Sequence, residues 1–416
     1  MNRNLTTFIL ITLVLVVFAV VAVKQEDASV SNAQAGKALF PGLKQKVNDV
    51  AEIDTKRGKD TATVQLKDNR WVVKDKEGYY ANLDKVKRTI LGVANMKLVE
   101  AKTKKKANYD KLQVEDPVDD MAKSTLVTLK DDQNKVLAAV ILGKVKSDFS
   151  HPDDSSMYVR KDKDPQAWQV TGELHATAAA ADWLDDQLLN IQPSRVQRVI
   201  VTPAQGKPYT VQKQATQKAN QAQHYVLADM PKGRSMKSDS VADGMARVIS
   251  GLRLLDVQKA ASFDPSKDMD DKKQAKKAEF QTIDGLVIDA DLHKQYNNTY
   301  MILTASFDAA LRPAPADDAQ DKKADAKTDA AKKSDAGKPA SPHPQAPKLE
   351  EIAAVQQEVA ELNERLKGWV FRVADSKVSP LNKSVADLLM DDKPKVASKH
   401  KAVPKHKAMA KPKTMH

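Results

Sequence analysis

The stretch Asn82–Glu100, NLDKVKRTILGVANMKLVE, decides the fold together with a second stretch, Ser240–Lys259, SVADGMARVISGLRLLDVQK. Each begins with a residue that can cap a helix, and apolar residues then recur at helical spacing. These residues are Val86, Ile90 and Val93 in the first stretch and Val241, Met245, Val248 and Leu252 in the second. Both stretches therefore predict an amphipathic helix, capped by Asn82 and by Ser240.

A gap-free alignment makes these stretches an internal repeat. It matches identical residues, namely Asp84/Asp243, Arg88/Arg247, Ile90/Ile249, Gly92/Gly251 and Ala101/Ala260. Alternating apolar segments precede each helix and predict strands over residues 50–53, 61–67, 71–73, 196–202, 209–213 and 225–227. The repeating unit is thus a set of antiparallel strands followed by a helix that packs on them.

Two looser copies extend this pattern. The first has strands over 126–130, 136–142, 157–160 and 168–170 and a helix over 174–189; the second has strands over 285–289, 300–307 and 369–373 and a helix over 381–389. Residues 350–367 predict one more amphipathic helix. The expected fold class is α+β: an N-terminal transmembrane helix followed by repeated antiparallel strand-strand-strand-helix modules, with a disordered insert and a disordered basic tail.

Composition divides the chain into five parts. An anchor over 1–28 precedes a first α+β domain over 45–191, and a second domain over 192–311 is completed by 349–392. Residues 312–348 contain no Val, Ile, Leu, Met or aromatic residue, so they cannot bury enough apolar area to offset chain entropy. We predict disorder for this insert and for the Lys-rich tail, 393–416.

The segment Leu5–Val23 (LTTFILITLVLVVFAVVAV) has no charge, Gly or Pro. As a helix it would span about 28 Å, close to the hydrocarbon core of a bilayer. It is interpreted as an uncleaved single-pass anchor, with cleavage after Ala22 as the alternative. The residues chosen to represent it are Leu5, Phe8, Leu15, Phe18 and Val23.

The flanks of this segment suggest its orientation. A single N-terminal hydrophobic segment with a small basic flank usually keeps its N-terminus in the cytoplasm, so the body is expected on the periplasmic side of a bacterial inner membrane. The chain has no Cys, which fits an oxidising envelope.

The net charge of +12 is concentrated in the tail. Residues 393–416 hold eight Lys and no acid, so the rest of the 416-residue chain carries only +4. The tail is expected to attract anionic lipid or polysaccharide, with a solubilising tail as the alternative. It lacks aromatic residues, which argues against specific nucleic-acid recognition. The lysines proposed to bind an anionic surface are Lys399, Lys401, Lys405, Lys407, Lys411 and Lys413.

Motifs that define a reaction class are absent from the sequence. It has no phosphate-binding Gly-rich loop, no dinucleotide-binding Gly pattern, no His-Glu-x-x-His and no nucleophile elbow. The lack of Cys excludes thiol catalysis and Cys-based metal sites. We therefore expect a non-enzymatic protein with no catalytic, cofactor-binding or metal-binding residues.

Some isolated residues still invite a functional interpretation. Residues 151–154 (HPDD) could hold a metal ion, but Pro and Asp also favour an ordinary polar turn. The group Asp289, Asp291 and His293 poses the same choice between a metal site and a solvated strand end. Trp183 could line a ligand groove, although core packing is the favoured interpretation, as it is for Trp71, Trp168 and Trp369.

The chain resembles the uncharacterised domain-of-unknown-function family 4340. The likeness rests on short motifs in a characteristic order, namely Val50-x-x-Ile53, Trp71-Val72-Val73 with Tyr80, the Leu83–Val93 helix, Asp182-Trp183-Leu184 leading to Leu188-Leu189, Leu362-Asn363, Gly368-Trp369-Val370-Phe371 and Asp387-Leu388-Leu389. It covers roughly residues 45 to 390 in pieces. The insert and the basic tail resemble additions specific to this chain.

This resemblance implies a bacterial, membrane-anchored protein that acts beside ABC-2-type or gliding-motility-like transporters, and it brings no catalytic residues. The first hypothesis is therefore an accessory or binding subunit that works with an ABC-type permease and ATPase. The second is a free-standing envelope protein that binds anionic lipid or cell-wall polymer through its tail. A hydrolase with a dispersed carboxylate site is the third.

Overall fold

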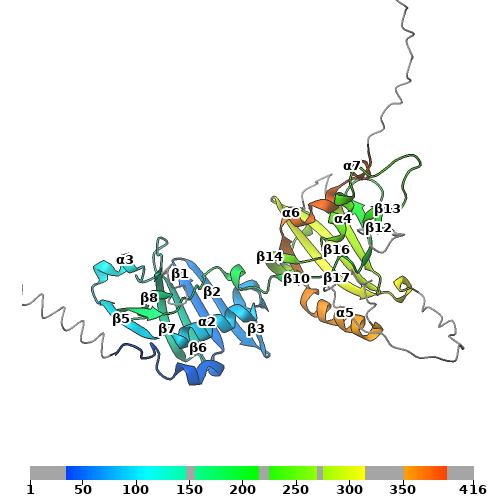
Figure 1. Ribbon diagram of the computed structural model, residues 1–416. Coiled ribbons are helices and arrows are strands. Elements are labelled where there is room, and N and C mark those ends of the chain that lie inside the picture. Colours follow the sequence, from blue (N-terminus) through cyan, green and yellow to red (C-terminus); the bar gives the residue numbers. More distant parts are fainter. Residues whose placement is uncertain (1–33, 147–154, 215–223, 269–274, 314–350, 391–416) are drawn as a thin grey trace, which may run out of the picture.

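A computed structural model describes residues 34–146, 155–214, 224–268, 275–313 and 351–390. They form two antiparallel sheets of nine strands each, with helices packed against them, so the predicted α+β class is confirmed (Figure 1). The predicted anchor, the tail and nearly all of the insert lie outside the described residues. Within the described ranges, no helix is both long enough and apolar enough to cross a membrane.

The first sheet is built from the N-terminal half of the chain. Its strands are β1 (Glu52–Arg57), β2 (Asp60–Lys67), β3 (Arg70–Val73), β4 (Tyr79–Tyr80), β5 (Leu98–Thr103), β6 (Thr125–Lys130), β7 (Val136–Lys146), β8 (Ser156–Lys161) and β9 (Ala167–Thr171). They lie in the order β4-β3-β2-β1-β6-β7-β8-β9-β5. Alternation of buried and half-buried residues along β6 shows why period-two sequence patterns located these strands.

The second sheet follows from the next half of the chain. Its strands are β10 (Gln187–Leu189), β11 (Val196–Pro203), β12 (Tyr209–Lys213), β13 (Tyr225–Leu227), β14 (Leu252–Lys259), β15 (Ala275–Thr282), β16 (Leu286–Gln295), β17 (Asn298–Phe307) and β18 (Trp369–Val373). They lie in the order β10-β14-β18-β17-β16-β15-β11-β12-β13. Because β10 already pairs with β14, the chain changes sheets before residue 192.

The two sheets share one strand order. Without β4 and β10, the order β3-β2-β1-β6-β7-β8-β9-β5 corresponds strand for strand to β13-β12-β11-β15-β16-β17-β18-β14. The gap-free alignment matches Leu98 with Val257, and these residues face Val170 and Phe371 on the corresponding strands β9 and β18. Each sheet draws strands from two of the predicted modules.

Of the two repeat helices, the first agrees with its sequence pattern and the second is shorter than its pattern predicts. The helix α2 (Leu83–Asn95) begins as expected, because the Asn82 side chain accepts a hydrogen bond from the Lys85 N–H at 3.0 Å. It ends before Leu98 because the next residues form β5. The helix α4 (Asp239–Ala246) is capped by Ser238 and not by Ser240, and Leu252 lies in a strand.

The predicted helix over 174–189 is wrong. This segment contains a 3₁₀ turn, η5 (Ala180–Trp183), and the strand β10. Trp183, Leu184, Leu188 and Leu189 are each buried to within 2% exposure, so they do not mark one face of a helix. Their burial comes instead from the passage of the chain between the two sheets.

The C-terminal part of the described chain completes the second sheet. The predicted helix over 350–367 is confirmed as α5 (Ile352–Leu366), which lies between β17 and β18 in the sequence and packs on β17. The helix predicted over 381–389 is instead a 3₁₀ turn, η9 (Ser379–Asn382), and a single turn, α7 (Val385–Leu388). The short helix α6 (Asp375–Val378) precedes them.

Candidate functional site: the junction groove

The residues that the sequence singled out are not gathered into one site. Several lie outside the described residues: Leu5, Phe8, Leu15, Phe18, Val23, His151, Lys399, Lys401, Lys405, Lys407, Lys411 and Lys413. The proposed roles of these residues in anchoring and in anionic-surface binding therefore stay predictions. A site must be built from residues that the fold itself brings together.

The acidic residues of β16 lie on a partly solvated strand. Asp289 faces Glu279 across the sheet. Desolvation is the main cause that raises the pKa of Asp289, and the like charge of Glu279 is the second. His293 contacts the Asp268 carboxylate at 2.7 Å instead of turning toward Asp291. The described residues hold no group of three or more acidic or histidine side chains arranged to bind a metal ion.

The tryptophans mainly serve packing. Trp183 is 2% exposed, and its Nε1 donates a hydrogen bond to the Thr177 carbonyl at 3.0 Å. Trp168 is buried in β9. Trp369 is half-buried, and its ring packs edge-on against Tyr79 of the first sheet, with the two centroids 5.0 Å apart. This last contact marks the place where the two sheets meet.

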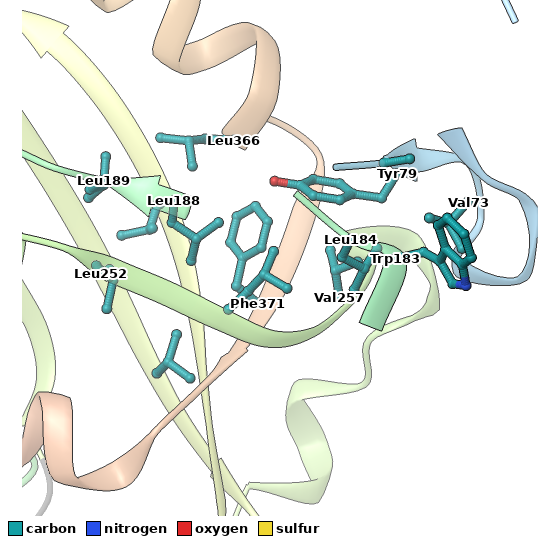
Figure 2. Packing of buried hydrophobic residues seen from close by; sticks show 14 of the residues in the cluster. Val73, Tyr79, Trp183, Leu184, Leu188, Leu189, Leu252, Val257, Leu366 and Phe371 are labelled. Carbon is teal, nitrogen blue, oxygen red and sulfur yellow. The ribbon is translucent and has the colours of Figure 1, made fainter. Parts of the chain in front are cut away.

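Tyr79 joins the sheets. It lies on β4, is 2% exposed, and its ring contacts both Trp369 and Phe371 of β18, the latter at 5.8 Å between centroids. Figure 2 shows the ring pointing from the first sheet toward Phe371 and Leu366. One cluster of buried apolar residues continues through this contact from one sheet to the other. The sheets are therefore joined by packing as well as by the chain.

Polar contacts surround this apolar junction. Lys76 pairs with Asp256 at 2.8 Å, and Arg70 pairs with Glu364 of α5 at 2.5 Å. The connecting segment adds backbone bonds on both sides, because Asp185 N–H donates to the Tyr80 carbonyl and Leu254 N–H donates to the Asp186 carbonyl. Both half-exposed ion pairs are worth little alone, but the backbone bonds hold the segment in register with both sheets.

The helix α5 forms the wall of the junction on the side of the second sheet. Arg195 binds both Glu358 carboxylate oxygens, at 3.0 and 2.7 Å, and also binds Asp284 at 2.8 Å. Burial tends to raise the pKa of Asp284, but hydrogen bonds from Thr282 and Arg195 outweigh it and hold that pKa below its usual value. This bidentate pairing attaches the N-terminal half of α5 to the sheet.

The C-terminal half of α5 is attached by side chains that replace a missing strand. β18 pairs with β17 from Thr299 to Met301. Among the described residues, no strand pairs with the rest of β17 on this side. Asn363 supplies the bonds: its Oδ1 accepts from the Ala305 N–H at 3.0 Å and its Nδ2 donates to the Ala305 carbonyl at 2.7 Å. Arg365 similarly donates to the Leu188 carbonyl at 3.2 Å.

A groove of about 670 Å³ lies along this junction. Its wall on the first sheet carries Arg70, Trp71 and Tyr80, and its wall on α5 carries Glu358, Glu361, Leu362, Glu364 and Arg365. Arg70 donates to the Tyr80 hydroxyl at 2.8 Å and also lies over its ring. The groove thus combines aromatic surface with carboxylates and guanidinium groups. This composition is suited to binding a peptide segment that carries both polar and apolar side chains.

Sequence reasoning missed most of this site. Tyr79 and Trp369 are far apart in the chain, and their contact follows from the docking of two sheets. Local periodicity of apolar residues does not predict such a contact. Tyr80, Asn363 and Trp369 do appear among the motifs of the family resemblance, but with no role attached. The available sequence signal was the side-chain amide of Asn363, which directly follows the buried Leu362 on a helix rich in charged residues.

Comparison with known proteins gives a family and no function. A family profile described as "Domain of unknown function (DUF4340)" matches residues 71–277. This range runs from Trp71 at the groove through the first sheet and the connecting segment to β15. Neither a curated protein nor a solved structure matches the chain. Over residues 71–277, the chain belongs to the DUF4340 family, a family of unknown function.

Proposed function

We propose that this protein is a non-enzymatic, single-pass, membrane-anchored binding subunit of an ABC-type export system. The observation that carries the proposal is the junction groove, where two sheets and α5 present aromatic and charged side chains along one open surface. Grooves at domain junctions are common binding places because each partner side supplies a separate wall. A polar segment of a permease or of its cargo is the intended occupant.

The membrane part of the proposal rests on sequence alone. Leu5–Val23 would anchor the chain in a bacterial inner membrane and leave the two sheets on the periplasmic side. From the shared strand order we also infer that the body arose by duplication of one sheet unit. In this arrangement α5, which lies between β17 and β18, is the feature that makes the two halves of the body different at the groove.

Affinity purification in several mild detergents tests the proposal. The full-length protein should recover a permease and its ATPase. Glu361→Arg, which reverses a charge on the groove wall, should reduce this recovery at least tenfold. Gln356→Arg is the matched control, because Gln356 is exposed on the same helix and does not line the groove.

Two results would count against the proposal in different ways. Recovery of neither transporter component in any detergent would contradict the export-system role. Equal recovery by both variants would leave the export-system role intact and remove the groove as the binding surface.

The alternative function is binding of anionic lipid or cell-wall polymer by the tail. It is favoured by the eight Lys without an acid in residues 393–416. Deletion of these residues should weaken sedimentation with vesicles that contain anionic lipid, and added salt should have the same effect. Binding that is insensitive to both changes would eliminate this alternative.

A further inference from the structure

A second hollow, of about 580 Å³, lies between α2 and the segment that follows β9. It shares no lining residue with the junction groove. Its apolar surface comes from Leu174, Ala176 and Trp183, and its polar rim includes Lys85, Arg88 and His175. A concave apolar surface with a few convergent polar groups is the usual form of a small-molecule site.

The hollow has a fixed wall. Leu174 is 8% exposed and packs against Gly92 of α2, where a side-chain carbon would come within 3.0 Å of its Cδ1 atom. Glycine at this position thus lets the segment approach the helix closely. Farther along, the Trp183 indole and the Ala179 N–H both bond to Thr177, at 3.0 Å each. These bonds lie within the segment and fix its course beside Lys85 and Arg88, which line the open side.

The corresponding place in the second sheet is filled. There the segment after β18, which corresponds to the segment after β9, packs onto α4 through η9. Val378 and Leu381 of this segment are each at most 1% exposed. Pro380 comes within 3.5 Å of where a Cβ atom on Gly244 would lie, and Lys377 donates to the Arg247 carbonyl at 3.0 Å. The same architecture can therefore close over its helix, and in the first sheet it leaves a hollow instead.

The rim of the hollow has unused positive charge. Its two carboxylates are engaged, because Glu173 contacts His175 and Asp182 accepts a hydrogen bond from the Thr177 hydroxyl at 2.9 Å. Lys85 donates to the Asp182 carbonyl. Across the part of the chain that the structure describes, no carboxylate pairs with Arg88, whose exposed guanidinium keeps its donors available.

We propose that this hollow binds a small amphipathic carboxylate. The apolar body of the ligand lies on Leu174, Ala176 and Trp183, and its carboxylate takes two parallel hydrogen bonds from Arg88, with Lys85 nearby as a second cation. The planar guanidinium fork matches a carboxylate better than a neutral alcohol. This site is independent of the groove and goes beyond the proposed export role.

Titration with 4-phenylbutyrate, followed by ligand-observed saturation-transfer NMR, tests the proposal. The full-length protein is held in lipid nanodiscs, and empty nanodiscs serve as the blank. A ligand of this size should bind with a dissociation constant on the order of 1 mM or tighter. The alcohol 4-phenyl-1-butanol lacks the charge and acetate lacks the apolar body, so each should bind at least tenfold more weakly.

Variants then locate the binding. Arg88→Ala should weaken phenylbutyrate at least tenfold and leave phenylbutanol unchanged. Lys87→Ala is the control, since Lys87 is an exposed lysine of α2 that does not line the hollow. Ala176→Leu, which fills the hollow, should weaken both ligands.

The proposal is overturned if acid and alcohol bind equally, because the anion is then not recognised. It is also overturned if Arg88→Ala and Lys87→Ala have the same effect, because binding is then unspecific. The proposal is overturned as well if none of the three ligands binds above the blank.

Discussion

Asn363 offers the sharpest test of how α5 is held at the junction. Its side-chain amide makes two hydrogen bonds to the backbone of Ala305, which is 6% exposed. Asn363→Ala leaves an N–H and a C=O of β17 without these partners. An unsatisfied buried backbone group costs about 1–3 kcal/mol, and the half-buried position of Asn363 favours the lower end of that range.

Two such groups predict a loss of about 2 kcal/mol in the free energy of unfolding. For a cooperative unit of about 200 residues, this loss lowers the melting temperature by about 4–8 °C. Differential scanning calorimetry measures the shift, and hydrogen exchange of the Ala305 amide reports the lost bond directly.

The control is Gln356→Ala, at an exposed position of the same helix, which should change stability by less than about 0.5 kcal/mol. If Asn363→Ala melts like this control and the Ala305 amide keeps its protection, the strand-replacing role of Asn363 is wrong.

Three further predictions concern the junction and two ionisable groups. Tyr79→Ala removes both ring contacts across the junction and should destabilise the protein by about 3–5 kcal/mol in urea unfolding, whereas Tyr79→Phe keeps the ring and should change little. The pKa of Asp284 is depressed in the folded state, so its contribution to stability is complete above the unfolded value of about 3.9 and is lost as the pH falls through the folded pKa. Asp284→Asn should therefore flatten the dependence of the unfolding free energy on pH below about pH 4. An unchanged slope of that dependence would contradict this assignment. The hydrogen bond from His224 to Asp243 raises the pKa of His224, so the contribution of this pair to stability is present below the unfolded value of about 6.5 and is lost as the pH rises through the folded pKa. NMR titration should place the midpoint of His224 above about 6.5. Asp243→Asn should lower this midpoint.

The local periodicity of apolar residues predicted much of the fold. Residues 209–213, 225–227 and 369–373 are strands with the bounds that their alternating patterns predict, because each lies in a sheet with distinct environments on its two sides. The helix predicted over 174–189 failed for a related reason. Its apolar residues are buried by two different sheets, and the sequence does not record which sheet buries which residue.

The repeat helices show how pairing between strands overrides local preference. The helix α2 contains every apolar residue of its pattern and ends at Asn95, before the strand that begins at Leu98. The helix α4 ends at Ala246 although its apolar spacing continues to Leu252, which also lies in a strand. These strands, β5 and β14, pair with β9 and β18. Partners more than 60 residues away therefore decide where each helix ends.

The candidate site was harder to predict than the fold. Arg195 binds Glu358 and Asp284, and each of these residues is unremarkable in its own stretch of sequence. Contacts of this kind depend on tertiary placement, which single-sequence patterns do not contain. The resemblance motifs marked Asn363 and Trp369, but only the structure gives them physical roles.

Photo-crosslinking in intact cells tests the central claim most directly. A photoreactive amino acid replaces Glu361 on the groove wall or, as the control, Gln356 on the same helix. The account predicts a crosslink from position 361 to a membrane permease and none from position 356. Crosslinks of equal strength from both positions, or none to any transporter component from position 361, would contradict it.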